Sequence, residues 1–185
     1  MLLPNAPPCS GNSKSQFDTI FSTQGEVVKQ STQRRTLCFI ARGRAFYLKT
    51  HSGIGWCEIF KNLLLFKMPV LGAGVEWKAL HTLRAMGINT VTPAGYGRRG
   101  LNPACQQSFL LTEDLGESVT LESLLKAWAG SKSLSRKDIR FKRELIRGTA
   151  QLVKRLHSHS VIHRDLYLCH IRIRTEDLAH QIQER

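Results

Sequence analysis

The segment VIHRDLYLCH, residues 161–170, places an Asp beside an Arg and a His in a pattern that suits phosphoryl transfer. Such chemistry needs a carboxylate that orients or deprotonates the acceptor hydroxyl, and Asp165 would fill that role. His163 and Arg164 would brace the loop through hydrogen bonds. His170 stands where a metal-binding Asn is usual. A bare His-Arg-Asp tripeptide is a weak signal, so its meaning depends on the rest of the chain.

The same segment and the residues before it offer a second interpretation, as a metal site. The side chains that could bind zinc are those of His157, His159, His163, Cys169 and His170. A structural zinc site usually shows compact pairs such as C-x₂₋₄-C with H-x₃₋₅-H, and this cluster lacks them. His157 and His159 also lie at an expected helix end, where the helix dipole favours a cation. Zinc therefore stays the alternative to a catalytic loop.

Phosphate binding requires cations upstream of this loop, and the sequence provides candidates. Lys49 ends a predicted strand, where it would contact nucleotide phosphates, although an isolated Lys there more often faces water. Glu76, on a later predicted helix, would hold this Lys through an ion pair. No glycine occurs in KQSTQRR, residues 29–35, where a phosphate loop is expected. Arg34 and Arg35 would supply charge in its place, or else belong to a solvated hairpin.

The elements that must position these residues follow from the hydrophobic pattern. Strands are expected at residues 25–29, 36–41, 45–50, 90–97 and 108–115, and helices within 54–68, 74–87, 120–130 and from 135 onward. Gly43 marks a tight hairpin turn, and Gly87 ends the second helix. Thr120 is the expected cap of one helix, and Ser135 with Asp138 forms the capping box of another.

This order predicts an α+β, two-lobed domain of the protein kinase type. Residues 1–24 are expected to be a loose leader. Residues 25–115 would form a five-stranded antiparallel sheet with inserted helices, and a linker would follow near 113–117. Residues 116–185 would form a partial helical lobe that ends just after the catalytic loop.

Composition leaves a second class of function open. The 185 residues carry a formal net charge of +13 and a sequence pI near 10.0, which favours polyanionic partners. A basic module that binds nucleic acid or a membrane without catalysis is therefore the alternative. No nucleic-acid-binding signature is evident, and the basic residues are spread over both halves, so we expect no nucleic-acid partner. Five scattered cysteines fit a reducing compartment better than a disulfide framework.

The first predicted helix, within 54–68, carries apolar residues that need a partner surface. Trp56, Phe60, Leu63 and Leu64 lie on one side of it at helical spacing. They would either pack on the sheet of the same lobe or dock on a membrane surface.

Several blocks of sequence resemble the lipopolysaccharide core heptose kinase family of Gram-negative bacteria. These blocks are RRTLCF, YLKTHSGIGWCEIFKNLLLFKMPVLGAGVEW, GLNPACQQSFLLTEDL and HRDLYLCH. The similarity extends from about Gly25 to His170. It implies a protein kinase-like fold that transfers phosphate from ATP to the first heptose of the inner core. It also implies a cytoplasmic protein, peripheral at the inner face of the inner membrane.

The resemblance implies a role for each candidate residue. Asp165 would be the catalytic Asp, Lys49 the nucleotide-phosphate Lys, and Glu76 its partner. The backbone of a hinge at Glu113 and Leu115 would contact adenine. The family pattern includes the His at position 170. ATP and Mg²⁺ are the implied cofactors, but Mg²⁺ prefers oxygen ligands, so this imidazole would contact phosphate instead.

One part of the kinase chemistry lacks a candidate in the sequence. The family's second acidic metal ligand lies in an Ile-Asp-Leu-His segment beyond the catalytic loop, and no such segment follows His170 here. Asp177 lies in TEDLAHQIQER, residues 175–185, which is expected to form a polar helix capped by Thr175. We therefore expect a truncated copy that is weakly active or inactive.

Overall fold

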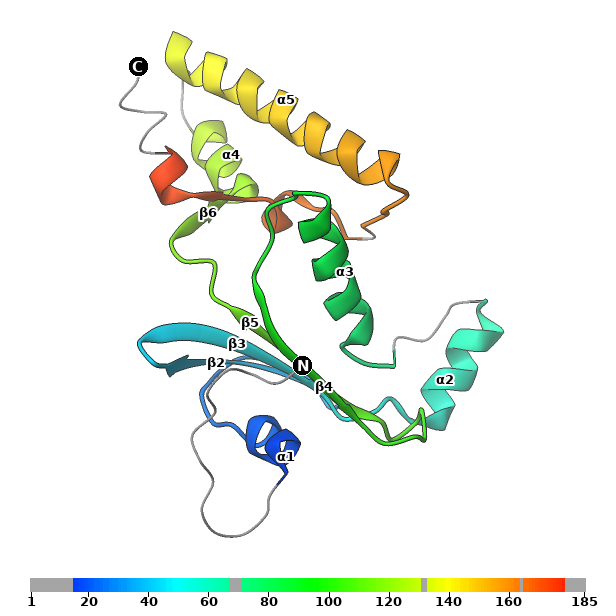
Figure 1. Cartoon of the computed structure of the whole chain (residues 1–185). Coiled ribbons are helices and arrows are strands. Elements are labelled where there is room, and N and C mark those ends of the chain that lie inside the picture. The colour runs from blue at the N-terminus through cyan, green and yellow to red at the C-terminus, as the bar shows by residue number, and fades with distance from the viewer. Residues whose placement is uncertain (1–14, 67–70, 131–132, 164, 179–185) are drawn as a thin grey trace. The chain divides into compact units, whose positions relative to one another are not determined.

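The computed structural model describes residues 15–66, 71–130, 133–163 and 165–178. The chain divides into two compact units, Met1–Asp114 and Leu115–Arg185, each drawn in Figure 1. The division lies one residue before the expected end of the sheet lobe.

The first unit contains the expected five-stranded antiparallel sheet. Its strands are β1 (Glu26–Gln30), β2 (Arg34–Ala41), β3 (Arg44–His51), β4 (Pro93–Arg99) and β5 (Gln107–Glu113), in the spatial order β1-β2-β3-β5-β4. The β2–β3 hairpin turns at Arg42 and Gly43, whose φ angles are 51° and 72°. Two successive positive φ angles are typical of the turn type that matches strand twist, and glycine adopts them without strain.

One face of the sheet carries an apolar core that β2, β3 and β5 build together. Leu37 lies opposite Leu48, which in turn lies opposite Leu111, so the three side chains share a face. These residues and Phe109 form one buried cluster. Removing such side chains from water is the main favourable contribution to the stability of this unit.

A short helix, α1 (Gln16–Phe21), covers this face and corrects the expectation of a loose leader. Phe17, Ile20 and Phe21 pack against the buried cluster, and the ring centroids of Phe17 and Phe109 lie 5.4 Å apart. The three residues follow the spacing of an α-helix, although the segment before them is rich in proline. Residues 1–14 lie outside the described part of the chain.

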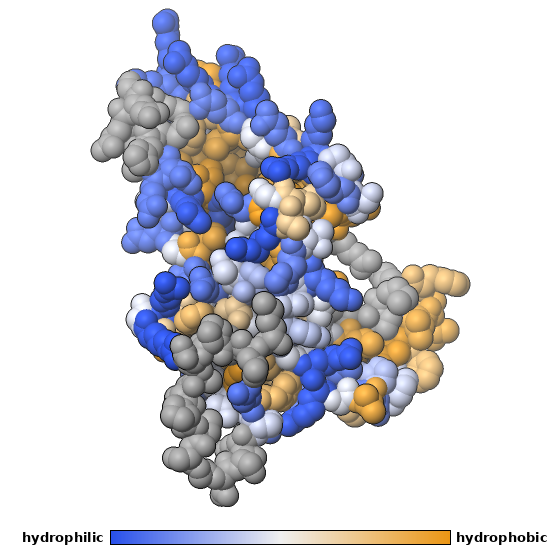
Figure 2. Space-filling view, in the orientation of Figure 1, coloured by the Kyte–Doolittle hydropathy of each residue, from blue (hydrophilic) through white to orange (hydrophobic). Residues whose placement is uncertain are grey.

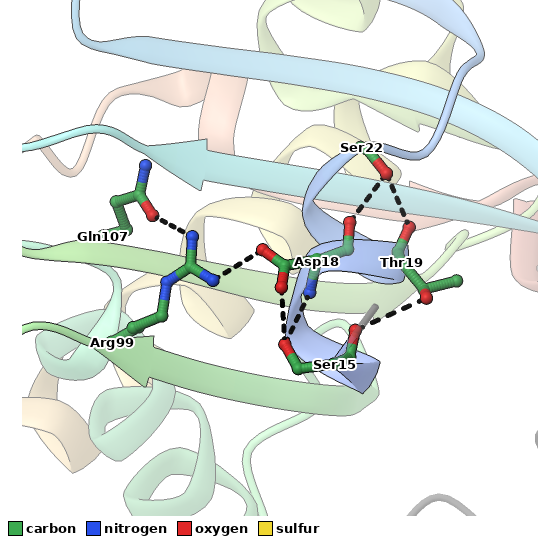
Figure 3. Close-up of polar contacts among 6 residues, drawn as sticks. All are labelled: Ser15, Asp18, Thr19, Ser22, Arg99 and Gln107. Carbon is green, nitrogen blue, oxygen red and sulfur yellow. Dashed lines mark hydrogen bonds and ion pairs between the residues drawn. The ribbon is translucent and has the colours of Figure 1, made fainter. Parts of the chain in front are cut away.

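Polar contacts hold α1 against the end of β4 (Figure 3). The side chain of Ser15 accepts a hydrogen bond from the amide of Asp18 and donates one to its carboxylate, with oxygens 2.8 Å apart. A guanidinium nitrogen of Arg99 lies 2.5 Å from the other carboxylate oxygen. The hydrogen bonds from Ser15 and Arg99 lower the pKa of Asp18. The guanidinium carbon of Arg99 also lies 4.8 Å from the centre of the Phe17 ring.

The opposite face of the sheet is covered by α3 (Gly74–Ala85). Ala73, Leu80 and Leu110 form a second buried cluster, with Trp77 and Tyr96 packed against it. The helix ends as expected before Gly87, whose φ is 66°. A further helix, α2 (Gly55–Leu64), follows β3 directly.

The second unit is mainly helical. It contains β6 (Ser118–Thr120), α4 (Leu121–Ala129), α5 (Arg136–Ser158), the 3₁₀ helix η1 (Leu168–His170) and β7 (Arg172–Arg174). The predicted caps are confirmed, because Thr120 accepts a hydrogen bond from the amide of Ser123, and Ser135 and Asp138 form a reciprocal capping box.

The second unit also contains a two-stranded sheet that was not predicted. β6 pairs with β7 in antiparallel register, with Val119 opposite Ile173. Arg172 donates hydrogen bonds from Nε to the Ser118 hydroxyl and from Nη2 to the Ser118 carbonyl, over 2.9 and 3.0 Å. Residues 175–178 are helical, and Thr175 already belongs to that turn rather than capping it.

Two whole-chain features complete the fold. Cys38, Cys57, Cys105 and Cys169 are free thiols. Among the described helices, none combines the length and apolar character that crossing a membrane requires.

Candidate nucleotide and acceptor site

The predicted ion pair between Lys49 and Glu76 is present in the first unit. Lys49 lies on β3 opposite Leu110, so its side chain emerges on the sheet face that α3 covers. Glu76 lies in the first turn of α3, and its carboxylate accepts a hydrogen bond from the ammonium group of Lys49. Their side chains are 38% and 41% exposed. A half-exposed cation held by a carboxylate on a rigid element is suited to binding an anion from solvent.

His51 joins this pair and was not predicted. It lies two residues after Lys49 on the same strand, and the period of two places both residues on one face. Burial lowers the pKa of His51, and the positive charges of Arg34 and Lys49 lower it further, while Glu76 acts in the opposite direction. The strand period alone would have found this residue, because LKTH places it beside the Lys.

The predicted role of Arg34 and Arg35, to supply charge for phosphate binding from a loop, is corrected by the structure. Both residues belong to β2 rather than to the loop before it, because Arg34 pairs with His51 and Arg35 with Thr50. Neighbouring residues of a strand point to opposite faces, so only Arg34 shares the face of Lys49. Arg35 lies on the other face, and its Nε is buried without a hydrogen-bond partner among the described residues. These two residues therefore do not act as one phosphate clamp.

The expected hinge, Glu113 and Leu115, follows β5. The amide of Glu113 donates to the carbonyl of Thr92, and the amide of Asp114 donates to the carbonyl of Ala45, each over 2.9 Å. The carboxylate of Glu113 lies 3.6 Å from the guanidinium of Arg44. No described residue accepts a hydrogen bond from the amide of Leu115. Of the three backbone amides of residues 113–115, that of Leu115 is the one without an acceptor among the described residues.

In the second unit, the end of α5 leads into the segment that contains Asp165. The amide of Ser160 donates to the carbonyl of His157, and the amide of Val161 donates to that of Leu156, over 2.9 and 3.0 Å. This pair of bonds is a Schellman motif, which usually has glycine at the left-handed position. Ser160 occupies that position here, with a φ of 57°. The motif fixes the direction in which the chain leaves the helix.

The imidazole of His170 and the backbone of Asp165 form one hydrogen-bonded turn. The carbonyl of Asp165 accepts hydrogen bonds from the amide of Tyr167, over 2.9 Å, and from Nδ1 of His170. A carbonyl oxygen only accepts, so Nδ1 of His170 must carry the hydrogen of this bond. The carboxylate of Asp165 is exposed. This arrangement orients the loop and leaves the carboxylate available to take a proton.

His163 and Arg164 are the other two residues of the predicted catalytic loop. The ring centroids of His163 and His170 lie 6.0 Å apart. Arg164 lies outside the described residues, so its predicted bracing role stays a prediction. In the described ranges, no group of three or more His, Cys, Asp or Glu side chains is close enough to hold a metal ion.

The implied cofactors can be compared with these donors. Lys49 and the amide of Leu115 are groups of the kind that bind nucleotide phosphate and base. Mg²⁺ is usually held by one or two carboxylates together with water and the phosphate oxygens of the substrate, and the exposed carboxylate of Asp165 is a donor of this kind. The described residues therefore fit the nucleotide in part, and Asp165 could contribute one ligand to a magnesium ion.

Comparison with known proteins identifies the family. Residues 18–184 match the sequence model of the "Lipopolysaccharide kinase (Kdo/WaaP) family". The chain is 41% identical over 157 residues to the lipopolysaccharide core heptose(I) kinase WaaP of Escherichia coli, covering 85% of this chain and 58% of that protein. It is also 41% identical over 165 residues to WaaP of Pseudomonas aeruginosa, covering 89% of this chain and 60% of the relative.

A solved structure agrees with the sequence comparison. The structure of WaaP in complex with acyl carrier protein superposes with a TM-score of 0.71 at 32% sequence identity, covering 88% of this chain and 58% of that one. The kinase-like α+β fold is thereby confirmed. The chain spans somewhat under two thirds of the length of these relatives. It belongs to the lipopolysaccharide kinase (Kdo/WaaP) family.

Proposed function

We propose that this chain carries the nucleotide and acceptor residues of an ATP-dependent kinase that phosphorylates the first heptose of the lipopolysaccharide inner core. The observation that supports it most directly is the Lys49–Glu76 ion pair in a member of this family. The curated relatives are named as heptose(I) kinases, which favours the sugar acceptor over the alternative of a nucleic-acid-binding module. The cytoplasmic face of the inner membrane, where the core acceptor is made, is the proposed site of action.

The chain's own residues would contribute to such a transfer in three ways. Lys49, held in place by Glu76, would bind the phosphates of the nucleotide and neutralise charge that develops during transfer. The Leu115 amide would position the base. The carboxylate of Asp165 would orient the heptose hydroxyl and accept its proton, while His170 maintains the backbone turn that presents this carboxylate. ATP would supply the phosphoryl group.

Nucleotide binding tests the first part. Isothermal titration of ATP into the purified chain is expected to show binding that Lys49→Met weakens about tenfold or more, since a hydrogen bond to a charged group contributes about 1.5–3 kcal/mol. Lys126→Met is the matched control. Lys126 is an exposed cation on α4 that pairs with Glu122 and has no part in the proposed site. Equal affinities of the wild type and Lys49→Met would contradict the assignment.

Phosphate transfer tests the second part. Cells that lack core heptose phosphate and express this chain are expected to regain only a small fraction of it, in keeping with the weak activity that the sequence predicts, as measured by mass spectrometry of the extracted core. Asp165→Asn should abolish the gain, because an amide cannot accept the hydroxyl proton. Glu122→Gln, an exposed carboxylate on α4, is the control that should leave it unchanged. No gain with a folded, expressed wild-type chain would overturn the proposed activity.

A further inference from the structure

The helix α2 presents a ridge of large apolar side chains that the fold does not cover. We define this ridge as Trp56, Phe60, Leu63 and Leu64, whose residues are 49%, 58%, 49% and 80% exposed. The rings of Trp56 and Phe60 stack with their centroids 5.8 Å apart. Figure 2 shows the corresponding orange patch at the right, where Figure 1 places α2.

The ridge is not the face by which α2 attaches to its own unit. Ile59 is the buried residue of this helix, at 5% exposure, and it points inward. The ridge residues follow one another at spacings of four, three and one along the helix, which places them together on an adjacent side. The apolar surface continues past the helix, since Leu65 and Phe66 are 56% and 100% exposed. A soluble monomer rarely leaves so much contiguous apolar surface without a partner.

Exposed cations occur on α2, α3 and β4 of the first unit. The side chain of Lys61 on α2 is 68% exposed, and its ammonium group lies 3.8 Å from a carboxylate oxygen of Glu58, so the two charges of this helix offset each other. Lys78 on α3 and Arg98 on β4 are exposed and line a cavity of about 270 Å³ together with Leu71 and Val75. The whole chain carries a net charge of +13.

We propose that the α2 ridge docks on the surface of an anionic lipid bilayer. Large apolar side chains that include a Trp suit the boundary between headgroups and acyl chains, and a chain with a net charge of +13 is attracted to anionic headgroups. The helix does not meet the requirements for crossing a membrane, so it would lie in the plane of the surface. Pairing of two ridges in a homodimer is disfavoured, because it would bring two chains of charge +13 together. This proposal does not depend on the proposed kinase activity.

Vesicle flotation at low ionic strength provides the first test. The wild-type chain is expected to float with vesicles of phosphatidylethanolamine and phosphatidylglycerol, and less with vesicles of phosphatidylcholine. The double variant Phe60→Ser/Leu64→Ser should lower the partition coefficient by about tenfold or more, because two large side chains no longer leave water. Both side chains are exposed, so its thermal unfolding should remain that of the wild type.

A matched control variant distinguishes binding through the ridge from nonspecific binding through other exposed apolar side chains. Val28 and Ile40, on β1 and β2 of the same unit, are 56% and 78% exposed. The double variant Val28→Ser/Ile40→Ser removes similar apolar surface elsewhere and should float like the wild type. An equal loss in both double variants would overturn the proposal, and so would wild-type protein that stays unbound.

Quenching of tryptophan fluorescence by lipid reports whether the ridge inserts into the bilayer. Lipids with brominated acyl chains should quench part of the wild-type emission, and Trp56→Phe should remove that quenching while retaining an aromatic ring on the ridge. Trp77 packs in a core cluster and should be unaffected. Failure of brominated lipid to quench any emission would contradict insertion. If the chain binds an acidic protein through the ridge but binds no vesicle, the ridge is a protein interface and the lipid proposal is wrong.

Discussion

Side chains from different strands and helices of the first unit meet at the proposed phosphate site. Lys49 and Glu76 form the pair that sequence spacing suggested, 27 residues apart. His51 lies on the same face, and its pKa is lowered chiefly by burial. An imidazole that stays neutral beside Lys49 does not add a charge that would compete for Glu76. The ion pair with Glu76 therefore holds Lys49 in place on the face where an anionic ligand would bind.

Replacing His51 should change how stability depends on pH. The folded-state pKa of His51 lies below its ordinary value of 6.5, so the unfolded chain binds the proton more readily. The free energy of unfolding should therefore fall as the pH drops from about 6.5 through the lower, folded-state pKa. His51→Gln removes this contribution, so urea denaturation between about pH 7 and pH 5 should show a shallower loss of stability. Parallel curves for both proteins would contradict this explanation.

Two elements of the fold depend on their ends. The amphipathic pattern of α1 is short, and its docking relies on aromatic packing with Phe109. The helix α5 spans 23 residues and relies on a capping box at its start and a Schellman motif at its end. The positions of both ends of α5 could be predicted from the sequence. The left-handed conformation of Ser160 in the Schellman motif could not, because glycine is the usual residue at that position.

Phe17→Ala should loosen α1 from the sheet. The side chain is only partly buried, so we expect the free energy of unfolding to fall by about 1–3 kcal/mol, less than for a fully buried Phe. Urea denaturation followed by circular dichroism would measure it. Gln16→Ala, an exposed substitution on the same helix, should stay within about 0.5 kcal/mol of the wild type. Equal stability of the two variants would mean that α1 contributes little.

Substitutions of Ser160 should have opposite effects according to their backbone preference. Ser160→Gly removes the strain of a positive φ but adds flexibility to the unfolded chain, so it should be neutral or stabilising by up to about 1 kcal/mol. Ser160→Val places a β-branched residue in that conformation and should destabilise by about 1–2 kcal/mol. Denaturation midpoints would check both. A Val variant as stable as the Gly variant would show that the motif is not strained.

At the scale of the whole molecule, local patterns predicted most of the first unit and less of the second. Alternation and turn signals are local, and they located the strands and the hairpin at Gly43. The pairing of β6 with β7 joins segments more than fifty residues apart in sequence, which no local pattern specifies. The local sign of β7 in the sequence is the alternation of apolar and basic residues in IRIR, residues 171–174. The sides of the sheet on which Arg34 and Arg35 lie likewise follow from the residue at which β2 begins. Local sequence propensity predicts the ends of a strand poorly.

The two units differ in how well they bury apolar side chains. In the described residues, Leu121 and Leu156 are the buried apolar residues of the second unit, whereas the first has two buried clusters. A groove of about 260 Å³ between α4 and α5 is lined by apolar side chains such as Leu125 and Leu145. Less buried apolar area means a lower free energy of local opening. Backbone amides of α5 should therefore exchange with solvent faster than those of β5.

A substitution of Gly148 tests whether α5 and β5 open independently of each other. Gly148 lies inside α5, and a Cβ added there would meet no atom within 4 Å. Gly148→Ala should therefore stabilise the helix by about 0.5–1 kcal/mol, which corresponds to exchange about two to five times slower. Hydrogen exchange measured by mass spectrometry should show this slowing in peptides from α5 and no change in peptides from β5, because the two elements belong to different compact units. Equal slowing in both would mean that the two units open as one, and protection of α5 equal to that of β5 in the wild type would contradict the difference in burial.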